Sequence, residues 1–370
     1  MVIESAIIAG AGIVGLATAV RLSQLGVHVL VCEQAPEIRA AGASIGLWRN
    51  ALDVLDDAGL GAAVDALGAP IATWFYDATG TPHRDPAYTD ADHEFLLVPR
   101  RQLNELLADT VGRGSIRLGA RLIGFGETAD SVTAEFADGT RATADLLIGA
   151  DGVYSRVREH LLPGTDAYEH TGHHAWRATV PTGSGPAAGT ILTVGRHRSR
   201  GGFTRTYGDT IMWMVNRFEC PPLTGTKREQ ALEVAGFLND NGWNDALLDL
   251  IDATPEDAIL HNRIMFVPAL PRWTSDRVAL IGDAAHGLSP HIAAGGTLGI
   301  EDVGVLTHAL TGHDALPEAL RAYESDRLPR YRTVHEHSRA VEQAGDAGVY
   351  AHRYAAFSHW MLTERPKVGI

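Results

Sequence analysis

A glycine-rich turn near the N-terminus constrains the fold of this 370-residue chain more than any other feature. The apolar segment 5–10, SAIIAG, predicts a short buried strand, and the segment 13–26, IVGLATAVRLSQLG, predicts an amphipathic helix. Where they join, the sequence GAGIVG spaces its glycines as G-x-G-x-x-G. In this pattern the first glycine permits a sharp turn, the second lets a phosphate approach the backbone, and the third lets the helix pack close to the sheet.

The three glycines are Gly10, Gly12 and Gly15, and the segment VHVLVCE at 27–33 completes a β-α-β unit. The helix after Gly12 offers free N–H groups and the positive end of its dipole to a phosphate. Glu33 ends the second strand, where a carboxylate can accept hydrogen bonds from ribose hydroxyls. The unit therefore predicts a dinucleotide site, and it does not distinguish NAD from FAD.

Two further segments repeat the order of strand, glycine turn and helix far downstream. Residues 144–164 read ADLLIGADGVYSRVREHLLPG, and residues 277–302 read RVALIGDAAHGLSPHIAAGGTLGIED. In the first of these, Ser155 is placed to cap a short helix. In the second, Asp283 stands at the start of the turn.

The middle of the chain has a different pattern. Residues 170–218 contain HHAWRATV, TILTVG, FTRTYG and TIMWMVN, whose alternating polar and apolar side chains predict an antiparallel sheet with one covered face. Residues 71–96 contain TGTPHRDPAYTDADHEF and predict an excursion rather than core. Residues 227–251, and the chain from 303 to about 345, have helical patterns.

These segments predict a fold of class α/β, or α+β for the whole chain. We expect a discontinuous Rossmann-like domain, an inserted antiparallel-sheet domain that binds the substrate, and C-terminal helices. The Rossmann-like domain comprises residues 1–70, 97–165 and 270–320. The substrate domain comprises residues 71–96 and 166–269, and the C-terminal helical segment comprises residues 321–370.

Composition excludes several classes of protein. The chain has 31 Lys and Arg against 45 Asp and Glu, a formal net charge of −14, which disfavours binding to nucleic acid. Cys32 and Cys220 have no paired spacing, so we expect no disulfide and a cytoplasmic location. Glu4 and no basic residue precede the first apolar run, and no stretch reaches the roughly 18 apolar residues of a spanning helix. We therefore expect neither export nor a membrane partner.

The three turns, GAGIVG, DLLIGADGVYSRVR and ALIGDAAHGLSP, occur in an order that resembles the FAD-dependent aromatic hydroxylases of the p-hydroxybenzoate hydroxylase fold, the group A flavoprotein monooxygenases. The resemblance covers most of residues 4–340, with weaker similarities in EIRAAGASIGLWRNA, VPRRQLNELL and ALRAYESDRLPR. It implies FAD as cofactor, NADPH or NADH as co-substrate, and O2 as oxidant. It also implies that a flavin C4a-hydroperoxide transfers one oxygen atom to an aromatic or heteroaromatic small molecule.

The resemblance also implies where FAD lies. The first turn holds the pyrophosphate and adenosine side, and Asp283 lies against the ribityl chain or the diphosphate. The loop after Pro290 follows the isoalloxazine, and the next helix directs its N–H groups toward the flavin N1/C2=O edge, where reduced flavin is negative. The predicted cofactor-binding residues are Gly10, Gly12, Val14, Gly15, Glu33, Gln34, Arg39, Gly46, Arg100, Leu122, Asp151, Asp283, Pro290, Gly295, Gly296 and Thr297.

Some of these residues have an ordinary alternative. Arg39 and Arg100 match positions that contact the phosphates or the ribityl hydroxyls, but they could also be solvated surface arginines. In the family the second turn links the FAD domain to the groove for the nicotinamide cofactor. Asp151 and Arg158 could equally serve there only to tie the turn together.

The chain departs from the family at two places. The family often has Gly-Gln-Gly where this chain has Ala293, Ala294 and Gly295, and alanine tolerates positive φ poorly. Either the loop geometry differs, or the two alanines have ordinary φ. The family commonly has proline where Arg49 stands, and this arginine faces either the flavin or the solvent.

Catalytic side chains are expected to be few, because the cofactor carries the chemistry. His291 in the flavin loop is a candidate acid or base, with an ordinary surface histidine as the alternative. Arg177 is the second candidate, with a solvated arginine as the alternative. We expect no metal site, because the histidines at 170, 173 and 174 lack a convincing fourth ligand.

The substrate pocket is expected on the inserted strands. Alternation along the first of them places His174 and Trp176 on one face and Arg177 on the other. One of these faces should form a pocket wall, with sheet core as the alternative for each apolar residue. The pocket candidates are His174, Trp176, Arg177, Met212 and Met214.

Other functions are compatible with the predicted fold and cofactor. The same fold could catalyse epoxidation or act as a reductase or saturase. Halogenation is less compatible, since the Trp-x-Trp-x-Ile-Pro signature of flavin halogenases is absent and MWMVN is the nearest stretch. A non-catalytic flavin-binding sensor is the alternative from another class. We expect a monomer, or a homodimer made by the C-terminal helices.

Overall fold

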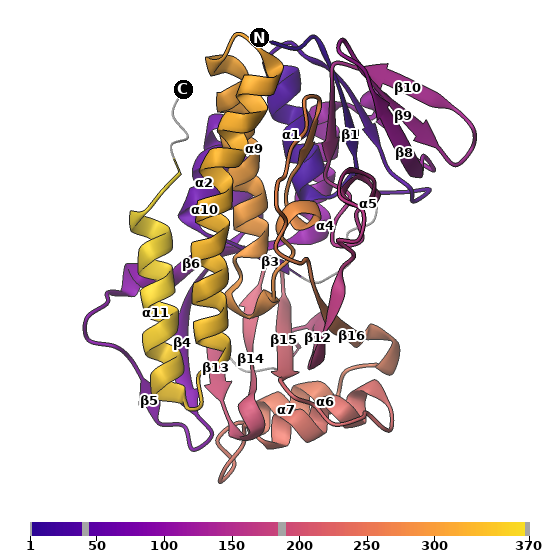
Figure 1. Cartoon of the computed structure of the whole chain (residues 1–370). Coiled ribbons are helices and arrows are strands. Elements are labelled where there is room, and N and C mark those ends of the chain that lie inside the picture. The colour runs from indigo at the N-terminus through magenta and orange to yellow at the C-terminus, as the bar shows by residue number, and fades with distance from the viewer. Residues whose placement is uncertain (1, 39–43, 184–189, 367–370) are drawn as a thin grey trace.

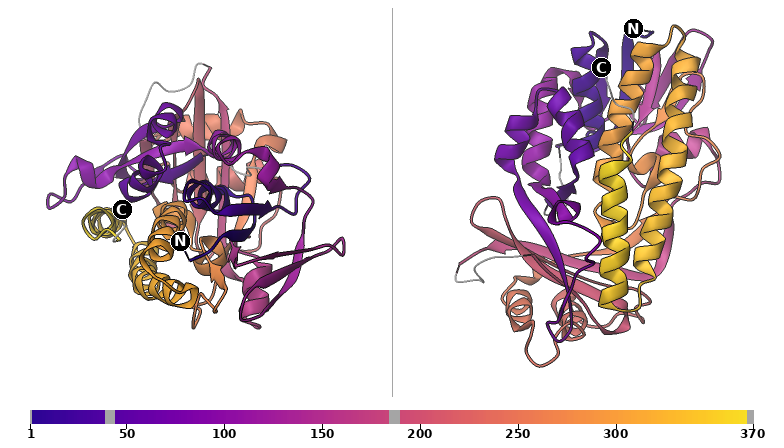
Figure 2. Two further views of the ribbon diagram at one scale, coloured as in Figure 1. Left: turned by 90° about the horizontal axis from the view of Figure 1, so that it is seen from above. Right: turned by 90° about the vertical axis from the view of Figure 1, so that its left-hand side faces the viewer.

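The computed structural model describes residues 2–38, 44–183 and 190–366 (Figure 1). Its strands form three sheets, of five, three and nine strands. The five-stranded and nine-stranded sheets lie at opposite ends of the molecule, and long helices run from one end toward the other (Figure 2).

The five-stranded sheet is parallel throughout and has the order β17-β11-β1-β2-β7. Its strands come from distant parts of the chain: β1 Ser5–Ala9, β2 His28–Cys32, β7 Ile116–Arg117, β11 Leu146–Gly149 and β17 Val278–Leu280. The inner strands are buried almost along their whole length, which explains their unbroken apolar sequences. Because the strands are parallel, the turns after β1, β11 and β17 lie at one edge of the sheet.

Helices and a small sheet surround these strands. Helix α1 packs against α4 and α9, and α2 packs against α9 and α3. The bounds are α1 Ile13–Gln24, α2 Arg49–Asp57, α3 Gly61–Leu67, α4 Arg100–Val111, α5 Arg156–Leu161, α8 Asp283–His286 and α9 Gly295–Gly312. The three-stranded antiparallel sheet contacts β1, β11 and α5, and consists of β8 Leu122–Glu127, β9 Val132–Phe136 and β10 Arg141–Ala144.

The nine-stranded sheet has the order β16-β12-β15-β14-β13-β4-β6-β3, with β5 paired to β4. All its pairs are antiparallel except β13 with β4. The bounds are β3 Ser44–Leu47, β4 Ala69–Asp77, β5 Pro82–His83, β6 Glu94–Pro99, β12 Tyr168–Pro181, β13 Thr190–Val194, β14 Ser199–Thr206, β15 Thr210–Arg217 and β16 Leu260–Phe266.

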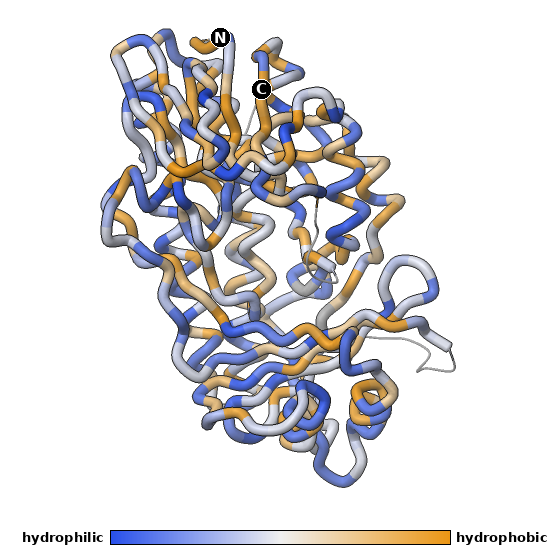
Figure 3. The backbone as a smooth tube through the Cα atoms, turned by 90° about the vertical axis from the view of Figure 1, so that its right-hand side faces the viewer, coloured by the Kyte–Doolittle hydropathy of each residue, from blue (hydrophilic) through white to orange (hydrophobic). Residues whose placement is uncertain are grey.

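Each face of the large sheet meets different elements. Helices α6 Lys227–Gly236 and α7 Asp245–Asp252 cover one face, and polar and apolar residues mix along its strands (Figure 3). The other face is directed toward the loop with the 3-10 turn η5 Pro290–Ile292 and toward the C-terminal helices α10 Leu316–Glu342 and α11 Ala347–Thr363. These two helices lie side by side.

The structure confirms the predicted fold class, with the predicted antiparallel pairs at 170–218. One detail of the prediction holds only in part: residues 79–91 form an exposed excursion, but the flanking residues 71–77 and 94–96 belong to strands of the large sheet. Strand β4 joins the large sheet, and Ile71 and Phe75 are buried there because α11 covers them. The exact domain boundaries stay a prediction.

Candidate active site

The three glycine turns meet at one edge of the parallel sheet. A Cβ built on Gly10 would lie 2.4 Å from the carbonyl oxygen of Ala150, in the turn after β11. A Cβ on Gly282, in the turn after β17, would lie 3.2 Å from Val14 at the start of α1. Segments separated by more than a hundred residues therefore form one continuous surface, as ligand sites of open α/β sheets do.

The first turn has the geometry of a phosphate cradle. Gly10 has φ +102°, which favours glycine, and a Cβ on Gly15 would lie 2.1 Å from the Gly10 carbonyl oxygen. In contrast, Gly12 is exposed, caps the N-terminus of α1, and has no atom within 4 Å of its would-be Cβ. Two glycines serve close packing, and the third faces open space at the helix N-terminus, an arrangement that can accept a phosphate group.

Glu33 links this turn to the end of β2. Its carboxylate accepts hydrogen bonds from the backbone N–H of Ala11 at 2.9 Å and of Ala35 at 2.8 Å. A carboxylate has about four acceptor positions, so two remain for ribose hydroxyls. The neighbouring Gln34 is exposed, whereas the side chain of Leu122, the first residue of β8, is buried in the core, so that only its backbone could reach a cofactor.

Asp283 lies exposed at the start of α8, directly after Gly282, which has φ +58°. Arg100 begins α4 and is close enough for its charge to interact with Asp283. Burial lowers the pKa of Arg100, and the Asp283 carboxylate partly offsets this shift. A cation and a carboxylate thus stand beside each other at the mouth of the late turn, where a ribityl or diphosphate group would find both a donor and an acceptor.

The flavin loop contains one strained residue. Ala293 has φ +52° and ψ +26°, a left-handed conformation that a side chain disfavours, whereas Ala294 has φ −90°. The loop therefore keeps the backbone turn that glycine would take more easily, and only the second alanine has ordinary φ. Beyond it, Gly295 begins α9 and lies 3.7 Å from Asp283, measured from its would-be Cβ.

Three other predicted cofactor positions serve packing. A Cβ on Gly296 would lie 2.3 Å from Ile45, and one on Gly46 would lie 3.0 Å from the Phe95 ring. The buried Thr297 hydroxyl accepts a hydrogen bond from the Trp48 backbone at 3.0 Å. These contacts hold β3 against β6 and α9.

The other predicted arginines and acids of the cofactor region differ in exposure. Asp151 accepts hydrogen bonds from the Ser155 hydroxyl and the Arg156 backbone, and the buried Arg158 donates to three carbonyl oxygens, so both tie the second turn together. Arg49 is exposed and pairs with Asp53 and Asp56, which settles its alternatives in favour of solvent. Pro290 is exposed, and Arg39 lies outside the described residues.

A buried group of charges supports the late turn and was not predicted. Asp302 on α9 accepts hydrogen bonds from the Gly282 backbone at 2.8 Å, from His286 at 2.6 Å and from Arg327 at 2.7 Å. Glu301 accepts two hydrogen bonds of 2.6 Å from Arg330. The sequence contains a signal for this group. Two acids interrupt an apolar helix in GIED, and two arginines follow in DRLPR, which is typical of buried acids paired with arginines.

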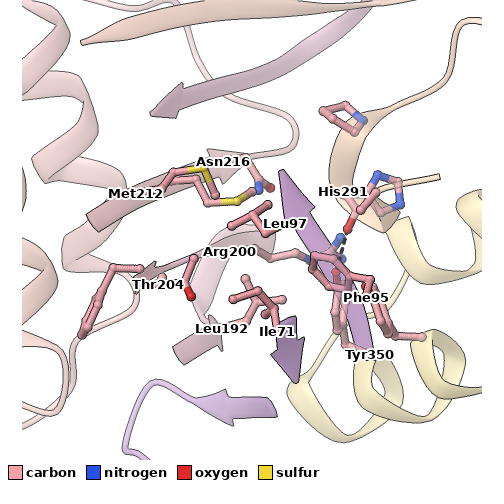
Figure 4. A pocket seen from close by; sticks show the side chains of 16 residues that line it. Ile71, Phe95, Leu97, Leu192, Arg200, Thr204, Met212, Asn216, His291 and Tyr350 are labelled. Carbon is pink, nitrogen blue, oxygen red and sulfur yellow. Dashed lines mark hydrogen bonds between the residues drawn. The ribbon is translucent and has the colours of Figure 1, made fainter. Parts of the chain in front are cut away.

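A cavity lies between the nine-stranded sheet, the flavin loop and α11 (Figure 4). It encloses about 700 Å3 of space, part of which is open to solvent. Carbon and sulfur atoms dominate its surface. The lining residues are Ile71, Phe95, Leu97, Leu192, Arg200, Gly202, Phe203, Thr204, Met212, Met214, Asn216, Pro290, His291, Ala293, Tyr350 and Tyr354.

The strand faces decide which of the predicted pocket residues reach this cavity. Met212 and Met214 line it, and Arg177 is paired in register with Met214, so it lies on the same face of the sheet. The predicted pocket role of His174 and Trp176 is wrong, because both side chains lie on the opposite face of the sheet. Trp176 is fully buried in the core beneath α6 and α7, and His174 stacks on His261.

His291 also corrects the expectation of a surface histidine. Its ring is buried, its Nε2 donates to the Ser338 carbonyl oxygen at 2.9 Å, and its Nδ1 accepts from the Ser289 hydroxyl at 2.7 Å. Burial and the nearby Arg200 charge lower its pKa to about 3. The imidazole is therefore neutral, with both nitrogens engaged, and it suits a wall of the cavity better than an acid or base.

Arg177 remains a candidate for contact with the reacting groups. It is half-buried on the cavity face of β12, and its guanidinium makes no hydrogen bond or ion pair with another described residue. Burial lowers its pKa, and the charge of Arg100 lowers it further. The two arginines therefore lie near each other.

The cavity residues that sequence reasoning missed come from two places. Tyr350 and Tyr354 lie on α11, whose sequence had been assigned only to a helical segment, although aromatic residues four apart indicate one packed face. Arg200 and Asn216 lie on alternating strands, and no sequence signal distinguishes them from solvated residues. Within the described ranges, no group of three or more His, Cys, Asp or Glu side chains is arranged to hold a metal ion.

Among the described residues, no helix has both the length and the apolar character needed to cross a bilayer.

Comparison with known proteins agrees with this geometry. The FAD binding domain family matches residues 4–338. The chain is 30% identical to the 6-hydroxynicotinate 3-monooxygenase of Bordetella bronchiseptica, over 88% of each chain. It is also 30% identical to the FAD-dependent urate hydroxylase of Klebsiella pneumoniae, over 89% of this chain and 87% of that one.

A solved structure supports the same assignment. The crystal structure of Klebsiella pneumoniae HpxO complexed with FAD and uric acid matches 96% of this chain and 93% of that chain, with a TM-score of 0.82 and 27% sequence identity. Fold, glycine turns and relatives agree. This chain is a member of the FAD-dependent aromatic hydroxylases, the group A flavoprotein monooxygenases.

Proposed function

We propose that this flavoprotein monooxygenase hydroxylates an aromatic or heteroaromatic small molecule bound in the cavity between the nine-stranded sheet and the flavin loop. When bound, FAD supplies the redox chemistry that takes a hydride from NADPH or NADH and delivers one oxygen atom of O2 to the ring. The protein residues bind and orient the two molecules and keep water away from them.

One observation carries this proposal. The predicted flavin loop contributes Pro290, His291 and Ala293 to the lining of the same cavity that Met212 and Met214 line from the sheet. A ring in this cavity would therefore lie between the sheet and the loop that follows the isoalloxazine. The apolar walls suit a flat ring and exclude water, which protects reactive intermediates.

The chain's own residues would hold FAD along the edge of the parallel sheet. Gly12 and the N-terminus of α1 would receive the pyrophosphate, and Glu33 would accept hydrogen bonds from a ribose. Arg100 and Asp283 would bind the central part of the cofactor. The N-terminus of α9 at Gly295 would favour negative charge on the reduced ring.

We also propose a cytoplasmic location and a monomer or homodimer. The acidic composition and the absence of paired cysteine spacing support the location. The C-terminal helices would provide the contact surface in a dimer. Small aromatic molecules and O2 are the proposed partners.

The test begins with the visible spectrum of the purified protein, with FAD added if the flavin is lost. A library of hydroxylated benzene, pyridine and purine rings is then screened, in which each carboxylic acid is paired with its amide. The names of the relatives suggest 6-hydroxynicotinate, 3-amino-4-hydroxybenzoate and urate as members. We expect one ring class to accelerate NAD(P)H oxidation and to yield a hydroxylated product that carries 18O from labelled O2.

Other outcomes separate the alternatives. Oxidation of NAD(P)H that yields only hydrogen peroxide with every ring would contradict the proposal. A product without 18O indicates a reductase or saturase. Ring binding with no reduction of the flavin by either nicotinamide indicates a sensor.

A further inference from the structure

Two adjacent glycines interrupt the middle of β14, and they face opposite sides of the nine-stranded sheet. A Cβ built on Gly201 would lie 2.9 Å from Leu238, in the core beneath α6. Successive side chains of a strand point to opposite faces, so a side chain at Gly202 would point toward the cavity, which this residue lines. Packing beneath α6 therefore explains the first glycine and does not explain the second.

Gly202 leaves a gap in a row of side chains across the sheet. It pairs in register with Leu192 on β13 and with Met214 on β15. Both neighbours line the cavity, so their side chains flank a position that carries none. A glycine inside a strand marks a bulge, a bend or the close approach of another group. The register of β14 with both neighbours is unbroken here, so the gap is a slot that a bound molecule can enter.

This slot lies midway along the cavity. Arg200, Gly202 and Thr204 lie on the cavity face of β14, and the four residues from the first to the last span about 13 Å of strand. Figure 4 shows Thr204 and Met212 at the end of the cavity away from His291 of the flavin loop. A single six-membered ring beside the flavin loop is shorter than this path, so it would leave the slot and the far end unfilled.

The sheet side of the cavity suits an aliphatic group. The isoleucine, leucine and methionine side chains of the lining all belong to strands of the sheet, and they are Ile71, Leu97, Leu192, Met212 and Met214. Methionine side chains are flexible and adapt to different shapes. The hydroxyl of Thr204 donates to the carbonyl oxygen of Arg205 at 3.2 Å, so it is already engaged. A molecule that follows this surface would gain mainly from burial of carbon.

We propose that Gly202 is a specificity-determining residue, and that the substrate is a ring with an apolar extension of several carbon atoms that passes through the slot toward Met212 and Thr204. This inference rests on the proposed function, since it concerns the molecule that the same cavity binds. Burial of each methylene group strengthens binding about fourfold. A side chain at Gly202 would exclude the extension without reaching the ring beside the flavin loop.

The test uses the holoenzyme and two homologous series of probes, the 4-alkylphenols and the 6-alkyl-3-hydroxypyridines, with side chains from none to hexyl. Binding is measured from the change in flavin absorbance on titration. In the wild type we expect the dissociation constant to fall about fourfold with each methylene group, and to level off once the chain exceeds the cavity. A polar chain of equal length should lose this gain, so 4-(3-hydroxypropyl)phenol should bind at least tenfold more weakly than 4-butylphenol.

Gly202→Val places a branched side chain in the slot. It should weaken the binding of 4-butylphenol at least tenfold and that of phenol less than threefold. Arg205→Val is the matched control, because it places the same side chain on the opposite face of the same strand, and it should keep the wild-type series. If Gly202→Val does not fold, Gly202→Ala and Met212→Phe take its place. The first should reduce the gain per methylene group, and the second should end the gain at a shorter chain.

Two results would overturn the proposal. One is a wild type that binds the unsubstituted and the butyl member of each series with equal affinity. The other is a Gly202→Val variant that changes the affinity for short and extended rings by the same factor. If neither series binds while a ring of the library is hydroxylated, the proposal fails and the proposed function stands. If no ring binds or is hydroxylated, the proposed function itself fails.

Discussion

The cofactor region and the substrate cavity are built in different ways. The cofactor region joins three turns at the edge of a parallel sheet, where glycines and helix N-termini bring backbone atoms close together. The cavity is enclosed by side chains from a mixed sheet, a strained loop and the helix α11. The geometry of the cofactor region is set by backbone conformation, whereas that of the cavity is set by the orientation of side chains.

This difference affects what a substitution can do. In the cofactor region an added methyl group collides with main-chain atoms, which cannot move without disturbing the sheet. In the cavity, side chains can be exchanged with smaller effects on stability.

Gly15→Ala and Gly12→Ala should separate folding from cofactor binding. A Cβ on Gly15 would lie 2.1 Å from a main-chain oxygen, so we expect a loss of about 3 kcal/mol or more in the free energy of unfolding. Gly12→Ala should fold normally, because nothing lies near its Cβ, yet bind FAD at least ~10-fold more weakly, about 1.4 kcal/mol. Urea unfolding and FAD titration measure the two effects. Equal FAD affinity for Gly12→Ala and wild type would argue against the phosphate cradle.

Asp302→Asn tests whether the stability of the cofactor region also depends on side-chain interactions. The substitution removes the charge that balances the buried Arg327 and His286, so we expect a cost of about 3–5 kcal/mol. Burial alone would raise the pKa of Asp302, but His286 and Arg327 outweigh it and hold this pKa below its usual value. This contribution is present above pH 4 and is lost as the pH falls further.

The control for this experiment is Asp314→Asn, because Asp314 is exposed between α9 and α10. It should change the free energy of unfolding by less than about 0.5 kcal/mol. An equally small effect of Asp302→Asn would contradict the role given to the buried charges.

Part of the pH dependence of stability should come from buried histidines on the cavity side. Burial lowers the pKa of His173 to about 2 and that of His291 to about 3, so both stay neutral in the folded protein while the unfolded chain takes up protons below pH 6.5. Each histidine should therefore reduce the free energy of unfolding by about 1.4 kcal/mol per unit as the pH falls from 6.5 to 5. Urea unfolding at several pH values measures this slope.

His291→Asn removes one of the protons taken up on unfolding, so it should make the slope shallower by about 1.4 kcal/mol per pH unit. His28→Gln removes an exposed histidine on β2 and should leave it unchanged. The interpretation fails if both variants keep the wild-type slope.

Ala293→Gly should have the smallest effect. Glycine relieves the left-handed strain of this residue but gains entropy in the unfolded chain, so we expect a net stabilisation of no more than about 1 kcal/mol. Ala294→Gly is the matched control. It has ordinary φ and a buried methyl group, so it should destabilise the protein by about 1 kcal/mol. Thermal unfolding of the two variants compares them, and opposite signs are the expected result.

The same comparison explains what the sequence could predict. The roles of Gly10, Gly12 and Gly15 follow from spacing alone, because each role concerns the local backbone. The fold class followed from three strand and turn patterns in order. The contacts of these residues with FAD stay predictions.

The cavity could be predicted only in part. The alternation of polar and apolar residues predicted that Trp176 and Met214 belong to strands. It did not predict which face of the sheet α6 and α7 would cover. Arg200 looks like any polar residue of a half-exposed strand until α10 and α11 enclose it. The flavin-loop residue His291 was placed correctly along the chain, but its burial depends on the distant Ser338.

Helix α11 supplies Tyr350 and Tyr354 to the cavity and none of the predicted FAD contacts. Substitutions in this one helix can therefore reshape the cavity without touching the glycine turns. The wall that α11 provides and the surface that the glycine turns provide thus belong to separate stretches of the polypeptide.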